Sequence, residues 1–330
     1  TDPLPETLRG KAIEVFVIGR SSSLLCTSLS LARRLRDMDG LVIHTMYAPR
    51  ALVAGFFCKV LTRCSWVYDL YDHPSLTWVN SRGLARVLKR GIWSLVLSRM
   101  LRWADVWVIG MHPGILSYLP MPRHSCRLVF SEGPGYANEL VYEQSKVVPG
   151  KRKINICYAG ALKLVRGAGM IATWARDYEG PSACLHLMGK EDSDAVEAVE
   201  AVRDVAQQRG LCIVRHGPIK HTNVQAILRV CDIGLCPISP DVLNYRYAYP
   251  IKVIEYMSFG VIPVATDIHG VRALISNGQN GFVATYGNES FSRAITEAVI
   301  ACKEPESREK LVLSMRKSIK GRDWKSLNQR

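Results

Sequence analysis

Residues 246–266 of the 330-residue chain read RYAYPIKVIEYMSFGVIPVAT and combine a helix with the strand that follows it. Pro250 suits the first position of a helix, because its φ is already helical and its missing N–H is not needed there. Gly260 predicts the end of the helix, and the apolar residues after it predict a buried strand. Lys252 and Glu255 lie three residues apart and therefore share one helical face. The stretch predicts a helix whose first turns carry a cation and a carboxylate.

The alternation of strands and helices extends outward from this stretch in both directions. Strands are predicted at 154–158, 183–188, 212–215, 233–236 and 262–265, with helices at 195–209, 223–231 and 251–259. An earlier set of strands is predicted at 14–19, 41–44, 66–70 and 105–110, with helices at 24–36, 50–61 and 82–103. Strands that alternate with helices imply parallel sheets. A polar segment with Pro-Gly at 143–153 predicts a linker. We therefore expect an α/β protein of two Rossmann-like lobes, residues 1–147 and 148–330, which face one another across a cleft.

The composition fits a folded protein of the cytoplasm. Hydrophobic residues make up 48% of the chain and charged residues 22%. The sequence contains no run of eighteen apolar residues without a charge, so no transmembrane helix is predicted. The first residues do not have the pattern of a secretion signal. The ten cysteines contain no C-x-x-C spacing and sit mostly in apolar runs. This usage predicts buried, reduced thiols, with no disulfide frame and no zinc site.

The net charge of +14 predicts a polyanionic neighbour: a nucleic acid, an anionic membrane or a phosphorylated substrate. In the segment 82–103, basic residues interleave with apolar ones and tryptophan. Such a helix packs its apolar face on a sheet or lies on an anionic membrane, and both interpretations stay open. No helix-turn-helix, zinc finger or aromatic RNA-binding motif is present, so we expect no nucleic-acid partner.

Candidate site residues follow the predicted strands, because ligands of open parallel sheets bind beyond the carboxyl ends of the strands. Gly160 lets the backbone approach a ligand closely, and Arg166 precedes a helix start where anions are favoured. A guanidinium can bind two phosphate oxygens at once. A glycine followed by an arginine is also what a simple turn with a solvated side chain contains. Lys252 at a helix amino terminus suits a diphosphate, and Glu255 can accept hydrogen bonds from two ribose hydroxyls.

Five motifs occur in order across the second half of the chain. They are Tyr158-Ala159-Gly160-Ala161-Leu162 with Arg166-Gly167, His216-Gly217-Pro218-Ile219, Asp232-Ile233-Gly234-Leu235-Cys236-Pro237, Pro250-Ile251-Lys252 through Gly260, and Asn277-Gly278-Gln279-Asn280-Gly281-Phe282. Together they resemble the carboxy-terminal lobe of retaining glycosyltransferases of the GT-B fold, in the group 1 family (glycosyltransferase family four). More loosely, residues 68–74 and 103–109 are similar to segments of that family's acceptor lobe.

The resemblance implies a donor site and an acceptor side. The donor-binding residues are Gly160, Arg166, Gly217, Pro218, Tyr249, Ile251, Lys252 and Glu255. In this interpretation Arg166 and Lys252 contact the diphosphate and Glu255 holds the ribose. The glycine lies under the donor, Gly217 and Pro218 lie beside the base, and the segment around Tyr249 faces the transferred sugar. Asp72 and His73 are expected on the acceptor side, although Asp-His-Pro is also an ordinary turn with a helix-capping aspartate. The implied catalytic residues are Arg166, Lys252 and His73.

Three departures from the family pattern stand out. Ala161 occupies a position where many members carry an arginine. Tyr247 stands where many members carry the first of two glutamates, of which Glu255 matches the second. The chain also begins near what matches the end of the family's first helix, so we expect the first strand of the amino-terminal lobe to be absent.

The function that the resemblance implies is retaining transfer of a hexose-type sugar from a nucleoside diphosphate sugar to a hydroxyl. No Asp-x-Asp motif is present, so we expect a metal-independent reaction, with the nucleotide sugar as donor substrate and no cofactor. The expected acceptor is a glycan or lipid-linked molecule of cell-surface polysaccharide synthesis. We expect the protein in the cytoplasm, peripheral at the inner face of an anionic membrane. Two alternatives stay open: a nucleotide-sugar epimerase on the same scaffold, and a catalytically silent GT-B binding subunit.

Overall fold

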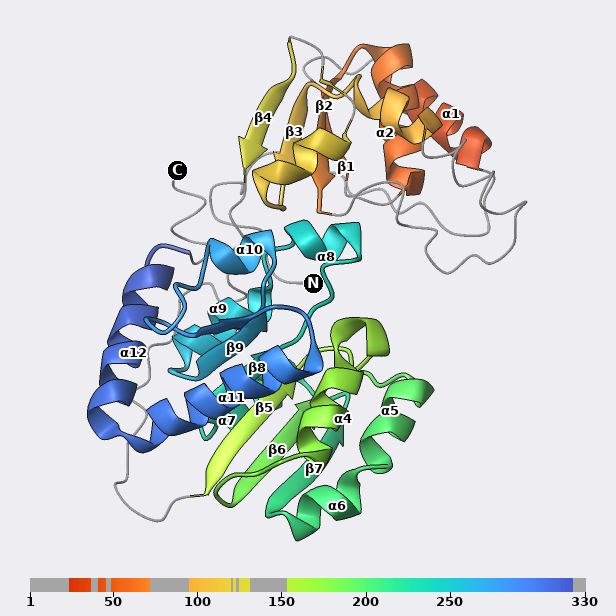
Figure 1. Ribbon diagram of the computed structural model, residues 1–330. Coiled ribbons are helices and arrows are strands. Elements are labelled where there is room, and N and C mark those ends of the chain that lie inside the picture. The colour runs from red at the N-terminus through yellow and green to blue at the C-terminus, as the bar shows by residue number, and fades with distance from the viewer. Residues whose placement is uncertain are drawn as a thin grey trace. The chain divides into compact units, whose positions relative to one another are not determined.

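A computed structural model describes residues 24–36, 41–45, 49–71, 95–119, 121–122, 125–130 and 153–322 (Figure 1). The chain forms two compact units. The first comprises Thr1–Asp69, Thr77–Trp107 and Pro120–Arg127, and the second comprises Leu70–Leu76, Val108–Leu119 and Leu128–Arg330. The predicted boundary at 147/148, the strand predicted at 14–19 and the question of the family's first strand all lie outside the described residues.

The smaller sheet has four strands in the order β1-β2-β3-β4. Its elements are α1 (Leu24–Leu35), β1 (Val42–Thr45), α2 (Pro49–Thr62), β2 (Ser65–Leu70), β3 (Val106–Ile109), the 3-10 helix η3 (Pro113–Tyr118) and β4 (Arg127–Phe130). Strands β1 and β2 are parallel, and α1 packs against α2. Of the predicted basic helix 82–103, residues 95–101 are helical and residues 82–94 lie outside the described part.

The larger sheet has six parallel strands in the order β10-β9-β8-β5-β6-β7 (Figure 1). They are β5 (Ile154–Ala159), β6 (Ala183–Met188), β7 (Leu211–Gly217), β8 (Ile233–Cys236), β9 (Ile262–Thr266) and β10 (Phe282–Ala284). The chain adds β6 and β7 on one side of β5, and then β8, β9 and β10 on the other. The strand order therefore reverses between β5 and β8, which is where open α/β sheets bind their ligands. The five strands predicted for this half are confirmed.

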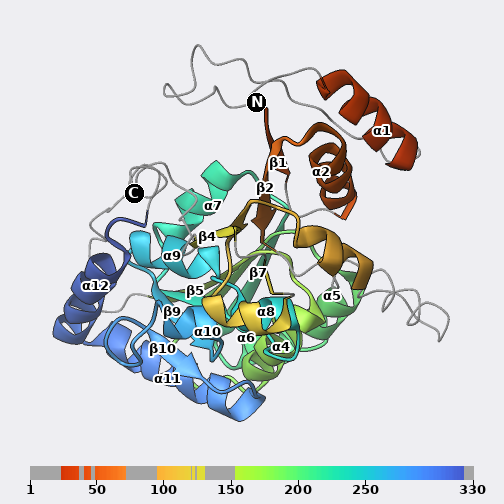
Figure 2. The same cartoon turned by 90° about the horizontal axis from the view of Figure 1, so that it is seen from above.

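Helices cover both faces of the larger sheet. They are η4 (Leu164–Arg166, 3-10), α4 (Ala168–Arg176), α5 (Ser193–Glu200), α6 (Arg203–Gln208), α7 (His221–Leu228), α8 (Leu243–Tyr247), α9 (Ile251–Ser258), α10 (His269–Arg272), α11 (Asn288–Lys303) and α12 (Pro305–Ile319). The view in Figure 2 shows α7 and α9 on the opposite side of the strands from α11. The single helix predicted at 195–209 is wrong: α5 packs against α4 and α6 against β7, so the chain breaks at Val202 to let each half pack separately.

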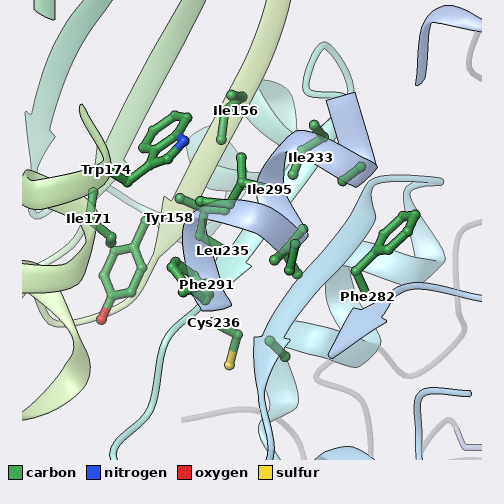
Figure 3. Close-up of a cluster of buried hydrophobic side chains, with 14 of the residues drawn as sticks. Ile156, Tyr158, Ile171, Trp174, Ile233, Leu235, Cys236, Phe282, Phe291 and Ile295 are labelled. Carbon is green, nitrogen blue, oxygen red and sulfur yellow. The ribbon is translucent and has the colours of Figure 1, made fainter. Parts of the chain in front are cut away.

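Alternate residues of β5 pack into two different apolar clusters, one on each face of the sheet. Ile156 and Tyr158 face α4 and α11, where they join Trp174 and Phe291 in the main apolar cluster (Figure 3). Cys157 and Ala159, which alternate with them along the strand, face the other side and join a second cluster with residues of α7 and α9. Successive strand residues point to opposite faces, so a strand covered by helices on both faces must be apolar throughout. This explains why β5 reads as a continuous apolar run.

Helix α12 is fixed to the sheet by a buried ion pair. Arg308 Nη1 lies 2.6 Å from Asp232 Oδ1, and the two side chains are only 5% and 2% exposed. The second carboxylate oxygen of Asp232 accepts a hydrogen bond from the N–H of Asn155, at 2.9 Å. The pair therefore connects α12 to the starts of β5 and β8, at the edge of the sheet opposite to the carboxyl ends of the strands.

Candidate functional site

Three glycines lie side by side at the carboxyl ends of β5, β6 and β7. Gly160, Gly189 and Gly217 all have positive φ, of 137°, 134° and 63°. The Gly160 N–H donates to the Met188 carbonyl and the Gly189 N–H donates to the Gly217 carbonyl, each at 2.8 Å. A Cβ on Gly189 would lie 2.1 Å from the Gly160 carbonyl oxygen, so only glycine fits there. Sequence analysis missed Gly189, although it follows its strand just as Gly160 does.

Lys252 lies over Gly160. Its Nζ is 4.0 Å from the centroid of the Tyr158 ring, and a Cβ on Gly160 would approach Nζ to 3.0 Å. In the described part of the chain no carboxylate forms an ion pair with Lys252. The Tyr158 hydroxyl donates to the Ala161 carbonyl at 2.8 Å, which fixes the ring and the loop after β5 together. Figure 3 shows this hydroxyl directed away from the other labelled side chains of the core.

Tyr256, one turn after Lys252, fixes the position of α9 on the sheet. Its buried hydroxyl accepts from the Ala159 N–H at 2.8 Å and donates to the Leu235 carbonyl at 3.3 Å. The ring packs where a side chain on Gly234 would stand, because a Cβ there would lie 2.4 Å from it. The hydroxyl therefore bridges β5 and β8 where the strand order reverses, and it places the first turn of α9 at the carboxyl ends of both strands.

Arg166 ends the short turn η4, on the other side of the β5 loop. Gly167, with φ of 83°, follows it, and a Cβ there would lie 2.1 Å from the Pro237 carbonyl oxygen. The Arg166 Nε donates to the Tyr245 hydroxyl at 3.2 Å. Burial raises the pKa of the Cys236 thiol to about 11, and the charges of Lys252 and Arg166 act in the opposite direction. Because Gly167 lies against Pro237, which directly follows β8, Arg166 lies near the carboxyl end of β8.

Glu255 lies on α9 one turn beyond Lys252, as predicted, and pairs with a histidine. Its Oε1 is 2.9 Å from Nε2 of His221, the first residue of α7. The Glu255 side chain is 16% exposed and that of His221 is 46% exposed. Sequence analysis did not find His221, because nothing in the local sequence shows that the start of α7 meets α9.

The segment before Pro250 is held by rings. Tyr247, which stands in place of a glutamate of the family pattern, stacks on His269 with centroids 4.7 Å apart and planes at 6°. His112 donates its backbone N–H to the Tyr247 carbonyl at 2.8 Å, and its ring lies 6.3 Å from that of Tyr249. A Cβ on Gly270 would clash with the Ala248 carbonyl oxygen, so α10 closes tightly on this segment. Tyr249 therefore lies in a closely packed segment two residues before Ile251, the first residue of α9.

Gly217 and Pro218 lie at the end of the edge strand β7. A Cβ on Gly217 would meet nothing within 4 Å, and Pro218 is exposed. The preceding His216 shares a hydrogen bond with His186 of β6, with Nε2 and Nδ1 3.1 Å apart. Burial lowers the pKa of both imidazoles, and in His186 the charge of His216 adds to the effect.

The acceptor-side residues cannot be placed in this site. Asp72 and His73 lie outside the described residues, so the third catalytic residue and the acceptor side stay predictions. Arg166 lies at the end of β8, and Lys252 lies over Gly160 at the end of the neighbouring strand β5. Glu255 lies one turn along α9 from Lys252, and Gly217 lies two strands from β5.

The sequence and the fold are similar to those of known glycosyltransferases. Residues 154–301 match the family model for "Glycosyl transferases group 1". Sucrose-phosphate synthase (tll1590) from Thermosynechococcus elongatus is similar in structure, with a TM-score of 0.68 and 14% identity over 97% of this chain and 79% of that one. Alr3699/HepE of Anabaena in complex with UDP gives 0.67 and 15%, over 92% and 79%. A glycosyltransferase from Rickettsia africae gives 0.66 and 12%, over 96% and 82%. Comparison with curated protein sequences gives no match.

The structural neighbours show the fold, and the family model shows the family. The chain has the fold of GT-B glycosyltransferases, with two sheets of parallel strands. Its residues 154–301, which contain every described site residue, are a group 1 glycosyltransferase domain.

Proposed function

We propose that this protein transfers a sugar from a nucleoside diphosphate sugar to a hydroxyl acceptor. The observation that carries the proposal is that Lys252 lies over Gly160 at the end of β5, while Arg166 lies at the end of the neighbouring strand β8, where the strand order reverses. Lys252 sits in the first turn of α9, where the helix dipole adds to its charge. Two cations, a helix amino terminus and a glycine without a side chain suit a diphosphate.

The chemistry proposed for this site is stabilisation of a leaving diphosphate. As the bond between the anomeric carbon and the phosphate oxygen breaks, negative charge grows on the diphosphate, and fixed cations stabilise that charge most in the transition state. The acceptor oxygen then bonds to the anomeric carbon from the same face, and its proton passes to a donor phosphate oxygen. The configuration is retained, and no metal is assigned a step. Arg166, Lys252 and the predicted His73 form the proposed catalytic set, and Asp72 joins His73 on the acceptor side.

The other donor contacts follow from the positions on α9 and β7. Glu255 faces the proposed ribose position with a carboxylate, and Gly217 and Pro218 leave open space for a base at the strand edge. Ile251 begins α9 and Tyr249 lies two residues before it, and we assign both to the proposed sugar position. The UDP complex of HepE makes uracil the first base to test.

Cell-surface glycan synthesis is the proposed setting, with a hexose as the transferred sugar and a glycan or lipid-linked acceptor. A similar structure that supports it is the lipopolysaccharide outer core galactosyltransferase WaaB, with a TM-score of 0.59 and 13% identity over 91% of this chain and 79% of that one. No cofactor is proposed, because the nucleotide sugar itself carries the activated group.

Association with the cytoplasmic face of an anionic membrane belongs to the same proposal. None of the helices in the described ranges has the length and apolar character that crossing a bilayer requires. In the first unit, however, the helix at 95–101 exposes Leu95 (58%), and the following Trp103 is 38% exposed. Arg99 and Arg102 are exposed beside them. An exposed tryptophan with arginines suits an anionic bilayer surface. Sedimentation with liposomes should show binding that requires anionic lipid and weakens with salt; equal binding to neutral vesicles would contradict the electrostatic part.

The experiment that tests the function uses the purified chain with labelled nucleotide sugars. Thermal stabilisation by UDP, GDP or ADP would identify the base, because a ligand that binds only the folded state raises the melting temperature. Transfer or hydrolysis of the labelled donor would support a transferase, and interconversion of the sugar would instead support the epimerase alternative. Binding without any turnover would favour the silent subunit, for which the ring stack at Tyr247 in place of a carboxylate is the specific observation.

A further inference from the structure

The short helix α8 places one side chain directly on a proposed catalytic cation. Tyr245 receives a hydrogen bond from Arg166 Nε at 3.2 Å, and the guanidinium carbon lies 5.4 Å from the centroid of the same ring. The ring itself packs against the main apolar cluster, which contains β8 and α9. Tyr245 is therefore fixed by the core on one side and contacts Arg166 with both its ring and its hydroxyl.

Arg166 needs such a support because of where it lies. It ends a 3-10 turn of three residues, and its two predecessors, Leu164 and Val165, are 47% and 51% exposed. An arginine on a short exposed turn has many rotamers, and ordering them on binding weakens the affinity for a ligand. A side chain that already holds the guanidinium in one orientation reduces this cost.

Tyrosine orients the guanidinium without neutralising it. Elsewhere in the same unit, Asp267 holds Arg272 through both Nε and Nη2, with one carboxylate oxygen on each nitrogen. A carboxylate in that position cancels the charge that a phosphate would meet. A phenol hydroxyl and an aromatic face can fix the plane of a guanidinium and do not themselves cancel its positive charge.

We propose that Tyr245 is a positioning residue that holds Arg166 toward the donor diphosphate. The inference rests on the proposed function, since Arg166 is assigned to the diphosphate there. The parallel contact between Lys252 and Tyr158 supports it, because both proposed diphosphate cations lie against tyrosine rings.

The test is a double-mutant cycle read by calorimetric binding of UDP, GDP and ADP, continued with whichever binds tightest. Tyr245→Phe keeps the ring and loses the hydroxyl, so affinity should fall about fivefold, as for one hydrogen bond. Tyr245→Leu should lose more, because the stacking is removed as well. In an Arg166→Ala background, Tyr245→Phe should cause no further loss, since contacting residues are not additive. Melting temperatures of all variants are measured alongside.

Tyr178→Phe is the matched control. It also removes a single tyrosine hydroxyl, which here donates to the Pro181 carbonyl, and it lies between α4 and β6 at the other end of the sheet. This variant should lower the melting temperature and leave nucleotide affinity unchanged.

The outcomes separate this inference from the function on which it rests. If the wild type binds no nucleoside diphosphate, both are overturned. If Arg166→Ala weakens binding and Tyr245→Phe does not, the donor site stands and the role of Tyr245 is overturned. Full additivity of the two substitutions would also overturn it, because Tyr245 would then act independently of Arg166.

Discussion

Cations around the larger sheet have two kinds of partner, aromatic rings and carboxylates. At the ends of β5 and β8, Arg166 and Lys252 lie against the rings of Tyr245 and Tyr158. Arg215 of β7, by contrast, binds Glu191 through Nε and Nη2 and Glu200 through Nη1. These carboxylates raise the pKa of Arg215 above its usual value.

The difference separates cations that maintain the fold from cations that can act on a ligand. A carboxylate neutralises its arginine and fixes two elements together, whereas an aromatic ring holds the cation and leaves its charge to attract an anion. Substitutions of cations paired with carboxylates should therefore change stability. Substitutions of cations that lie against tyrosine rings should change nucleotide affinity.

Arg308→Ala should give the largest effect and should fall on stability alone. It leaves Asp232 buried without its cation, which costs about 3–5 kcal/mol in unfolding free energy. Urea denaturation measures this loss. Nucleotide affinity of the folded fraction should not change, because the pair lies at the starts of β5 and β8; a weaker affinity would contradict a purely structural role for Arg308.

Lys252→Ala should give the next largest effect and should fall on function alone. Removing a fixed cation from a leaving diphosphate should lower turnover by about a hundredfold or more. The melting temperature should stay close to that of the wild type, because the amine makes a ring contact and no ion pair among the described residues. Lys310→Ala, at an exposed position on α12, is the charge-matched control. Near-normal turnover of Lys252→Ala would remove the proposed assignment.

Glu255 tests whether a carboxylate held by histidine behaves like the functional or the structural group. If it binds ribose, Glu255→Gln should weaken nucleotide binding by about tenfold, as for hydrogen bonds to a charged group, with little change in stability. His221→Gln should have a smaller effect, since it only orients the carboxylate from 2.9 Å. Titration of both variants with the nucleotide that binds the wild type measures this. A fall in stability with unchanged affinity would move the pair to the structural group.

The histidine pair on β6 and β7 should give the smallest effect. Burial lowers the pKa of His186 and of His216 below 6.5 in the folded protein, so the unfolded chain binds protons more readily. The stability that the neutral pair allows is therefore present above about pH 6.5 and is lost as the pH falls through the folded values. Melting temperatures between pH 5 and 8 should fall on the acid side, less steeply in His186→Asn. An equal slope in that variant would place the titration elsewhere.

The sequence determined the fold and the first layer of the site. Apolar runs of strand length predicted every strand from β5 to β9, because a strand buried on both faces must be apolar throughout. Pro250 and Gly260 fixed the limits of α9, and with them the positions of Lys252 and Glu255 on its first turns. The family motifs assigned Gly160, Arg166 and Lys252 to one donor site, and that assignment stays a prediction; the structure places Lys252 over Gly160 and Arg166 at the end of the neighbouring strand β8.

Only the tertiary structure decided what holds those residues. Tyr245 is 79 positions from Arg166 in the chain, and Lys252 is 94 positions from Tyr158. Such contacts depend on how the elements cross on the sheet, which local sequence does not specify. For the same reason, local sequence did not predict the contact between His221 and Glu255. Nor did it predict the break at Val202, where packing against α4 and β7 interrupts a continuous helical pattern. Periodicity gives each element its face, and only packing shows which residue of another element meets it.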